Sequence, residues 1–139
     1  MLMLLGALLM APLPDTTRQA VVVIVRHAEK ASETAALVAA RHHIVPTVIP
    51  TDGGVAVHAA AVARAARGPD GVVLVVGHSN TVMPIAAALG APRRPDLCDR
   101  SYSVMLVVTP GDPHGGVLQG HFGAVDPPGA DACAAMAPP

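Results

Sequence analysis

Two short apolar runs, Val21–Val25 (VVVIV) and Gly71–Val76 (GVVLVV), constrain the fold of this chain more than any other feature. Runs of about four to eight apolar residues rich in β-branched side chains are typical of strands that are covered on both faces of a parallel sheet. A third run, Ser103–Thr109, has the same character. Helix-favouring segments alternate with these runs. The alternation predicts a small α/β domain with three α/β/α layers and a mainly parallel, mixed sheet.

The segments between the apolar runs are rich in alanine and valine, and Gly, Pro or Ser residues bound them. The expected helices are Ser32–Arg41, Val55–Arg67 and Val82–Leu89. Ile44–Thr51 is predicted to be a second strand, confined to an edge because Pro46 and Pro50 cannot donate a ladder hydrogen bond. Val117–Phe122 is expected to pair with the strand before it as a hairpin.

The composition bounds both the size and the partners of the protein. The chain has 139 residues, of which 52% are hydrophobic and 14% charged, so one packed domain is expected, over residues 19–126, followed by a loose Pro/Ala tail over 127–139. The net charge is −1, and the only aromatic residues are one Phe and one Tyr. Neither a basic surface nor a stacking platform is therefore expected, which disfavours nucleic acid as a partner.

The chain begins with an apolar stretch, Met1–Met10, that is too short to span a bilayer, which takes about 20 apolar residues. Its length predicts a signal peptide over residues 1–18 and export to the periplasm or the extracellular space. No Lys or Arg precedes the stretch, so a misplaced start and a cytoplasmic protein are the alternative. Cys98 and Cys133 would pair in an oxidising compartment; two thiols that never meet are the other interpretation.

Two of the predicted strands end in a turn that carries a histidine. Val25 leads into Arg26 and His27, and Val76 leads into Gly77 and His78. The carboxyl ends of neighbouring parallel strands meet at one edge of a sheet, where ligands bind. We therefore expect His27 and His78 to face one cavity although 51 positions (78 − 27) separate them. The guanidinium of Arg26 suits phosphate oxygens, so the constellation favours a phosphoryl group.

These residues resemble a known family. Arg26–Lys30 (RHAEK), placed after VVVIV, resembles the R-H-G/R-H-A signature of the histidine phosphatase superfamily, which is phosphoglycerate mutase-like. Val73–Thr81 (VLVVGHSNT) resembles the second histidine block of that superfamily, and Asp99–Tyr102 resembles the segment before its last strand. The resemblance covers most of residues 20–123. It implies hydrolysis of phosphomonoesters through a phosphohistidine intermediate.

The resemblance also implies roles for single residues. His27 would be the nucleophile, with its second ring nitrogen held by a backbone carbonyl. Arg26 and His78 would neutralise charge on the phosphoryl oxygens, with Ser79 and Asn80 as further phosphate-binding groups. The partner would be a small phosphorylated substrate, and the scheme needs no metal and no cofactor.

The chain departs from the family pattern after its first block. A segment of about one helix and one strand is missing, and Lys30 stands in place of a second arginine, so Lys30 is either a phosphate-binding group or a solvated surface charge. The proton donor to the leaving group is Glu29, which is adjacent in sequence, or Asp52. The missing chain would expose apolar surface, which predicts weak activity and self-association as a homo-oligomer.

Three other functions compete with this interpretation. A phosphate-binding or interaction protein would keep His27 and His78 without turnover. A serine hydrolase would use Ser79, but Thr81 stands where the sharp nucleophile elbow needs glycine. A metal site is suggested by the remaining histidines, which lack ligand spacing: His42, His43, His58, His114 and His121. In the phosphatase, substrate choice would come from the loops Ala91–Arg100 and Gly111–Gly116.

Overall fold

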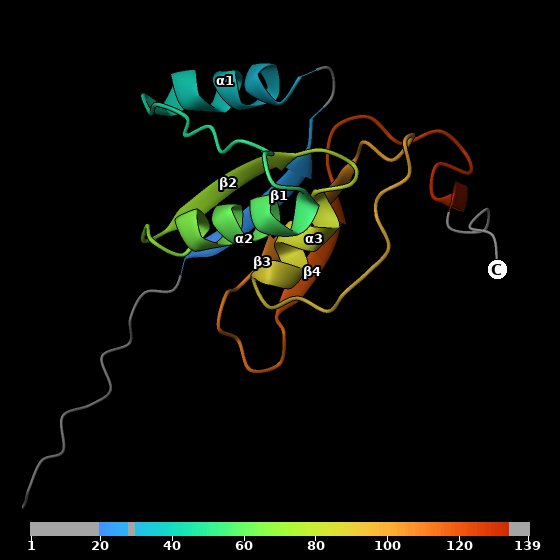
Figure 1. The fold of residues 1–139 in the computed structure, drawn as a ribbon. Helices are drawn as coiled ribbons and strands as arrows, with labels where there is room; N and C mark the ends of the chain where they lie inside the picture. The colour runs from blue at the N-terminus through green and yellow to red at the C-terminus, as the bar shows by residue number, and fades with distance from the viewer. Residues whose placement is uncertain (1–19, 28–29, 134–139) are drawn as a thin grey trace, which may run out of the picture.

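The computed structural model describes residues 20–27 and 30–133, which form three helices and a four-stranded mixed sheet (Figure 1). The expected signal peptide and Glu29 lie outside the described residues. In chain order the elements are β1 (Val21–Arg26), α1 (Ala31–His42), α2 (Val55–Ala66), β2 (Val72–Gly77), α3 (Val82–Ala88), β3 (Val104–Val108) and β4 (Val117–His121). Among these residues, no helix is long and apolar enough to cross a membrane.

The strand order is β2-β1-β3-β4, and only β1 and β2 run parallel. The prediction of a mainly parallel sheet is therefore wrong, although the α/β class and the mixed sheet are confirmed. The reason lies in the lengths of the connecting helices. The 12 residues of α2 span about 18 Å, close to the roughly 20 Å of a six-residue strand, and return the chain to the start of the sheet.

The seven residues of α3 span only about 10 Å, so they do not carry the chain back along β2. The loop after α3 instead returns to the carboxyl end of β2, where the Leu97 amide donates a hydrogen bond to the Ser79 carbonyl oxygen (3.1 Å). The strand β3 starts from this end and must run antiparallel to β1. A hairpin turn then makes β4 antiparallel to β3.

The hydrophobic core lies between one face of the sheet and the helices α2 and α3, which lie side by side in front of the strands (Figure 1). Val22 and Ile24 of β1 and Leu106 of β3 are buried on this face. The buried hydrophobic side chains of α2 repeat at the spacing of one helix face, and three of them are alanines, which allows close approach to the sheet: Ala59, Val62, Ala63 and Ala66.

The opposite face of the sheet is apolar but thinly covered. The strand register places Leu74, Val23, Val107 and Leu118 in one row across the four strands. Leu118 is 73% exposed, and Val72 on the same face is 74% exposed. α1 touches the sheet at the edge strand β2 and buries only Ala39, so a complete second helical layer is not formed by the described residues. The prediction of self-association stays a prediction.

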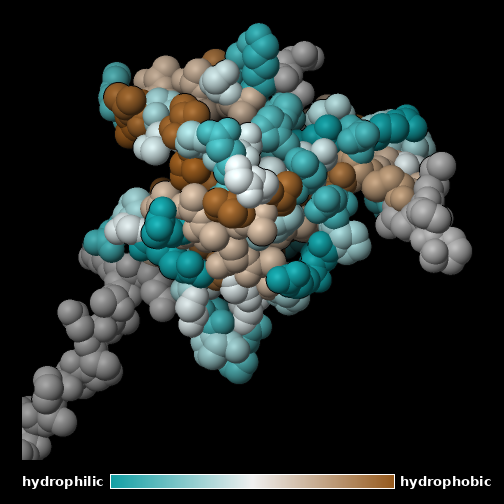
Figure 2. Space-filling view, viewed as in Figure 1, coloured by the Kyte–Doolittle hydropathy of each residue, from teal (hydrophilic) through white to brown (hydrophobic). Residues whose placement is uncertain are grey.

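The segment between α1 and α2 contradicts a second prediction. Residues 44–50 form no strand, because Pro46 and Pro50 lack the N–H groups of a ladder. Figure 2 shows hydrophobic residues gathered between α1 and the rest of the domain. The exposed hydrophobic side chains of α1 and this segment include Leu37, Ile44, Val45 and Val48.

The chain after β4 is fastened to the domain. Cys98 and Cys133 form a disulfide, which agrees with an oxidising compartment. The hydroxyl of Ser101 also donates a hydrogen bond to the Ala130 carbonyl oxygen (3.0 Å). Residues 127–133, whose composition predicted a loose tail, are thus held in place by a covalent bond and a buried hydrogen bond.

Candidate functional site

Two histidines meet where β1 and β2 end. Arg26 lies opposite Gly77 in the parallel register, and the His27 amide continues the ladder by donating a hydrogen bond to the Gly77 carbonyl oxygen (3.0 Å). One step further, Nε2 of His27 lies 2.6 Å from Nδ1 of His78, and the rings meet edge to face with centroids 4.5 Å apart. The structure therefore brings together the two imidazoles that the strand pattern placed at one edge.

The two nitrogens of His27 lie in different surroundings. Nδ1 is buried from solvent, whereas Nε2 faces His78, whose side chain is exposed. Either nitrogen of the contact can carry the proton, because a neutral imidazole has one donor and one acceptor. With the proton on Nδ1 of His78, the lone pair of Nε2 in His27 points towards the accessible side of the site. Nε2 is then the nitrogen suited to nucleophilic attack.

The turn between β2 and α3 fixes the backbone of His78. The hydroxyl oxygen of Thr81 accepts a hydrogen bond from the His78 amide (2.8 Å). A Cβ atom on Gly77 would lie only 2.9 Å from this same oxygen, so the tight turn requires glycine there. Thr81 is buried and serves the turn, which explains why a hydroxyl residue stands where a serine hydrolase would have glycine.

The guanidinium of Arg26 is buried beside the loop before β3. Its Nη1 donates hydrogen bonds to the carbonyl oxygens of Cys98 (2.9 Å) and Ser101 (3.4 Å), and its Cζ lies 4.1 Å from the ring centroid of Tyr102. Nε of Arg26 is buried and has no hydrogen-bond partner within residues 20–27 and 30–133. The side chain is thus a fixed positive charge, and its direct contact with a phosphate stays a prediction.

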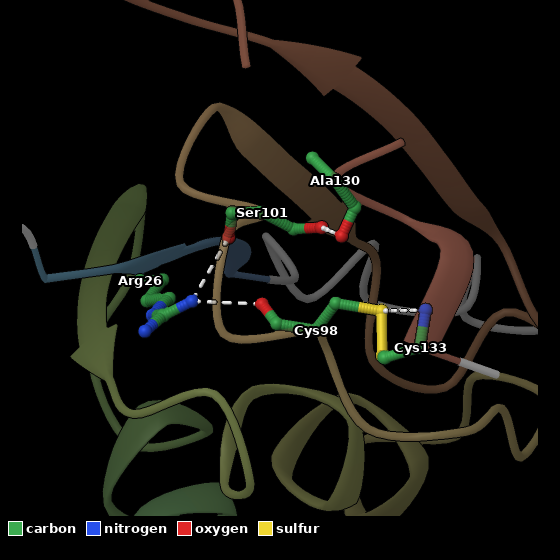
Figure 3. The surroundings of a disulfide bond; sticks show 5 residues. All are labelled: Arg26, Cys98, Ser101, Ala130 and Cys133. Atoms are coloured by element: carbon green, nitrogen blue, oxygen red, sulfur yellow. Dashed lines mark hydrogen bonds between the residues drawn. A yellow bond between two sulfur atoms is a disulfide. The ribbon is translucent and has the colours of Figure 1, made fainter. Parts of the chain in front are cut away.

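The C-terminal segment holds the loop on which Arg26 depends (Figure 3). The disulfide anchors Cys98, and the Ser101 hydroxyl reaches the Ala130 carbonyl. The carboxylate of Asp126 accepts hydrogen bonds from the amides of Tyr102 (2.8 Å) and Ser103 (2.9 Å). Partial burial raises the pKa of Asp126, but hydrogen bonds from the Ser103 hydroxyl and these amides outweigh it and leave that pKa below its usual value.

The other predicted phosphate-binding residues are less closely joined to the histidine pair. Nζ of Lys30 lies 3.3 Å from Oε1 of Glu33, with both side chains largely exposed, so the surface-charge interpretation of Lys30 fits its position. The Ser79 carbonyl oxygen accepts a hydrogen bond from the Leu97 amide, whereas Asn80 lines a cavity beside His78. Asp52 is exposed in the turn before α2 and does not line that cavity.

One predicted specificity loop lies at the wrong end of the sheet. Val108 is opposite Val22 near the start of β1, whereas Met105 is opposite Val25 near its end. The predicted specificity loop Gly111–Gly116, which follows β3, therefore lies at the end of the sheet away from His27. The expectation that this loop borders the site and selects the substrate is wrong. The error follows from the strand direction, because a parallel β3 would have ended beside the histidines. The loop over residues 91–100 does reach the site, through its contact with Arg26.

A cavity of about 280 Å³ adjoins the histidine pair. Among the described residues, its lining combines the start of α2 with the turn after β2, and the two histidines are its only ionisable side chains: Thr51, Gly54, Val55, His58, His78, Asn80 and Thr81. His58 is 8% exposed, and its Nδ1 donates to the Pro50 carbonyl oxygen (2.9 Å). In the sequence His58 was only one of several scattered histidines, and no spacing signal linked it to His78.

A second cavity, of about 580 Å³, lies near the end of β4 and contains Ser103, His121 and Asp126. The hydroxyl oxygen of Ser103 lies 2.8 Å both from Nδ1 of His121 and from Oδ2 of Asp126. In a hydrolase triad the carboxylate orients the histidine, whereas here it bonds the serine. The cluster therefore fastens the C-terminal segment to β3 and β4 and lacks the arrangement that activates a nucleophile.

Comparisons with known proteins add no assignment. No family model, curated protein or solved structure matches this chain. Within the described part of the chain, no group of three or more His, Cys, Asp or Glu side chains is arranged to hold a metal ion.

Proposed function

We propose that the protein hydrolyses phosphomonoesters through a phosphohistidine on His27, as a shortened relative of the histidine phosphatases. The observation that carries the proposal is the 2.6 Å contact between Nε2 of His27 and Nδ1 of His78 at the carboxyl ends of two parallel strands. Two imidazoles in contact, with a buried arginine as the residue before His27 in the chain, favour a small anion with several oxygens. The segment missing after the first block would also account for the thinly covered second face of the sheet.

The chemistry takes two balanced steps. In the first, the lone pair of Nε2 in His27 forms a bond to phosphorus, the bond from phosphorus to the ester oxygen breaks, and that oxygen leaves as the alcohol after taking a proton. The phosphoryl group replaces the contact between the two rings, so that Nδ1–H of His78 donates to a phosphoryl oxygen. In the second, water attacks phosphorus, the phosphorus–nitrogen bond breaks, and inorganic phosphate leaves.

A binding protein without turnover is the second candidate. The Nη1 bonds of Arg26 go to backbone carbonyls, and Lys30 pairs with Glu33 at the surface, so the site holds less free positive charge than the resemblance implies. Phosphoryl transfer depends on positive charge around the equatorial oxygens. We therefore propose slow turnover, and complete loss of turnover with retained phosphate binding would identify the second candidate.

Rapid acid-free quenching after mixing with radiolabelled aryl phosphate tests the proposal. We expect label on the wild-type protein that is stable to alkali and labile to acid, as phosphohistidine is, and no label on His27→Ala. His114→Ala is the matched control, because His114 is an exposed histidine in the turn at the far end of the sheet. Equal labelling of wild type and His27→Ala would refute the nucleophile assignment. Bound but never covalently attached phosphate would favour the binding protein.

A further inference from the structure

We infer that His58 donates the proton to the leaving group and that the cavity of about 280 Å³ receives a small, uncharged alcohol portion of the ester. The inference rests on the proposed function and deepens it by naming the leaving-group site. It assigns a role to neither of the two carboxylates, Glu29 and Asp52, that the sequence suggested as proton donors.

The hydrogen bonding of His58 prepares one ring nitrogen for this role. Nδ1 contacts a backbone carbonyl, which can only accept, so Nδ1 carries a proton. Nε2 bonds none of the described residues and is not sealed from solvent, although the whole side chain is only 8% exposed. His58 lines the cavity. In the inferred arrangement, Nε2 is the ring atom that serves it. A histidine oriented through one nitrogen while the other faces a cavity is arranged for proton transfer.

The cavity connects this nitrogen to the proposed phosphoryl site. His58 and His78 line the same space, and His78 contacts the nucleophile His27. In the inferred arrangement, an ester whose phosphorus lies against the His27–His78 pair extends its leaving group past His78 into the cavity. Among residues 20–27 and 30–133, no Lys, Arg, Asp or Glu side chain lines the cavity, so none of these residues offers a counter-charge to a second phosphate or a carboxylate.

The lining and the volume define the class of substrate. Thr51 supplies a hydroxyl and Asn80 an amide, which suit the hydroxyls of a small polyol, whereas the Thr81 hydroxyl is used by the turn. The volume is near the lower end of ligand sites, which span about 300–1,000 Å³. A phosphomonoester of a short hydroxylated alcohol meets both conditions.

The inferred proton transfer leaves the Nδ1 hydrogen bond of His58 in place. Protonated His58 donates from Nε2 to the ester oxygen as the bond to phosphorus breaks, and the neutral ring keeps its Nδ1 hydrogen bond to Pro50. In the second step, Nε2 accepts the proton of the attacking water, which restores the starting state. His58 thus gives up one proton in the first step and regains one in the second.

The test compares two leaving groups in His58→Asn, because the asparagine amide can still donate to Pro50 but cannot transfer a proton. Nitrophenolate can leave as the anion and needs no proton donor, whereas the leaving oxygen of glycerol must take up a proton. We expect His58→Asn to lower the single-turnover rate constant of phosphorylation about 100-fold or more with glycerol phosphate. With 4-nitrophenyl phosphate, we expect the same rate constant to fall less than about threefold. His114→Asn, the matched control, should change neither rate. Equal losses on both esters, or no loss on either, would overturn the inference.

A wild-type measurement keeps the inference testable if His58→Asn does not fold. With an internal proton donor, the phosphorylation rate of the wild-type protein should vary little across a series of esters with increasingly basic leaving groups. A steep fall with leaving-group basicity would show that no donor acts. Failure of the wild type to phosphorylate with any ester would instead refute the proposed function, and the role of His58 with it.

Discussion

Reduction of the Cys98–Cys133 disulfide should cost about 4 kcal/mol of folding free energy. The two cysteines are 35 positions apart. For a closed loop of that size, the chain-entropy relation gives a loss of roughly 13 cal/mol/K in the entropy of the unfolded chain, which is about 4 kcal/mol at 298 K. Because domains of this size are stable by only about 5–15 kcal/mol, the effect is large. The perturbation is confined to one bond, because the reductant breaks the disulfide and leaves the rest of the chain unchanged.

Urea unfolding followed by circular dichroism measures the effect. With a denaturant slope of about 2 kcal/mol/M, the midpoint should fall by about 2 M when a phosphine reductant is added. Cys133→Ser removes the crosslink at an exposed position, so its midpoint should match that of the reduced wild type and should not respond to the reductant. A wild-type midpoint that moves by less than about 0.5 M, or a Cys133→Ser midpoint that still falls on reduction, would refute the reasoning.

Three further outcomes follow from the packing and charges of the domain. Ile24→Ala should lower the free energy of unfolding by about 2–5 kcal/mol, because Ile24 is fully buried in the core. Leu118→Ala, on the exposed face of the sheet, should lower it by less than about 1 kcal/mol. Urea unfolding midpoints measure both changes. The lowered pKa of Asp126 means that its carboxylate stabilises the fold above the unfolded-state pKa and that this contribution is lost as pH falls through the folded-state pKa, so Asp126→Asn should flatten the acid limb of a stability–pH curve. An unchanged acid limb would show that the hydrogen bonds to Ser103 do not matter. Lys30→Ala should leave the free energy of unfolding, measured by urea denaturation, within about 0.5 kcal/mol of the wild-type value, because the Lys30–Glu33 ion pair is solvent-exposed.

The sequence predicted the local elements well where a period or a run was strong. The apolar runs became β1, β2 and β3, and the alanine-rich segments became α1 and α2, within one or two residues of the expected bounds. The pairing of β1 and β2 follows from the same pattern, and with it the meeting of His27 and His78. Ile44–Thr51 forms no strand because Pro46 and Pro50 lack the N–H groups that a ladder needs.

The residue pattern alone thus predicts the α/β class and the two histidines at neighbouring strand ends, because hydrophobic periodicity and turn residues act over a few positions. The direction of β3 arises only in the folded molecule, because it depends on how far α3 can carry the chain. The fold also joins Cys98 to Cys133 and places His58 on the cavity beside His78. These contacts link residues 20 or more positions apart, and no local pattern encodes a distance that arises from packing whole elements together.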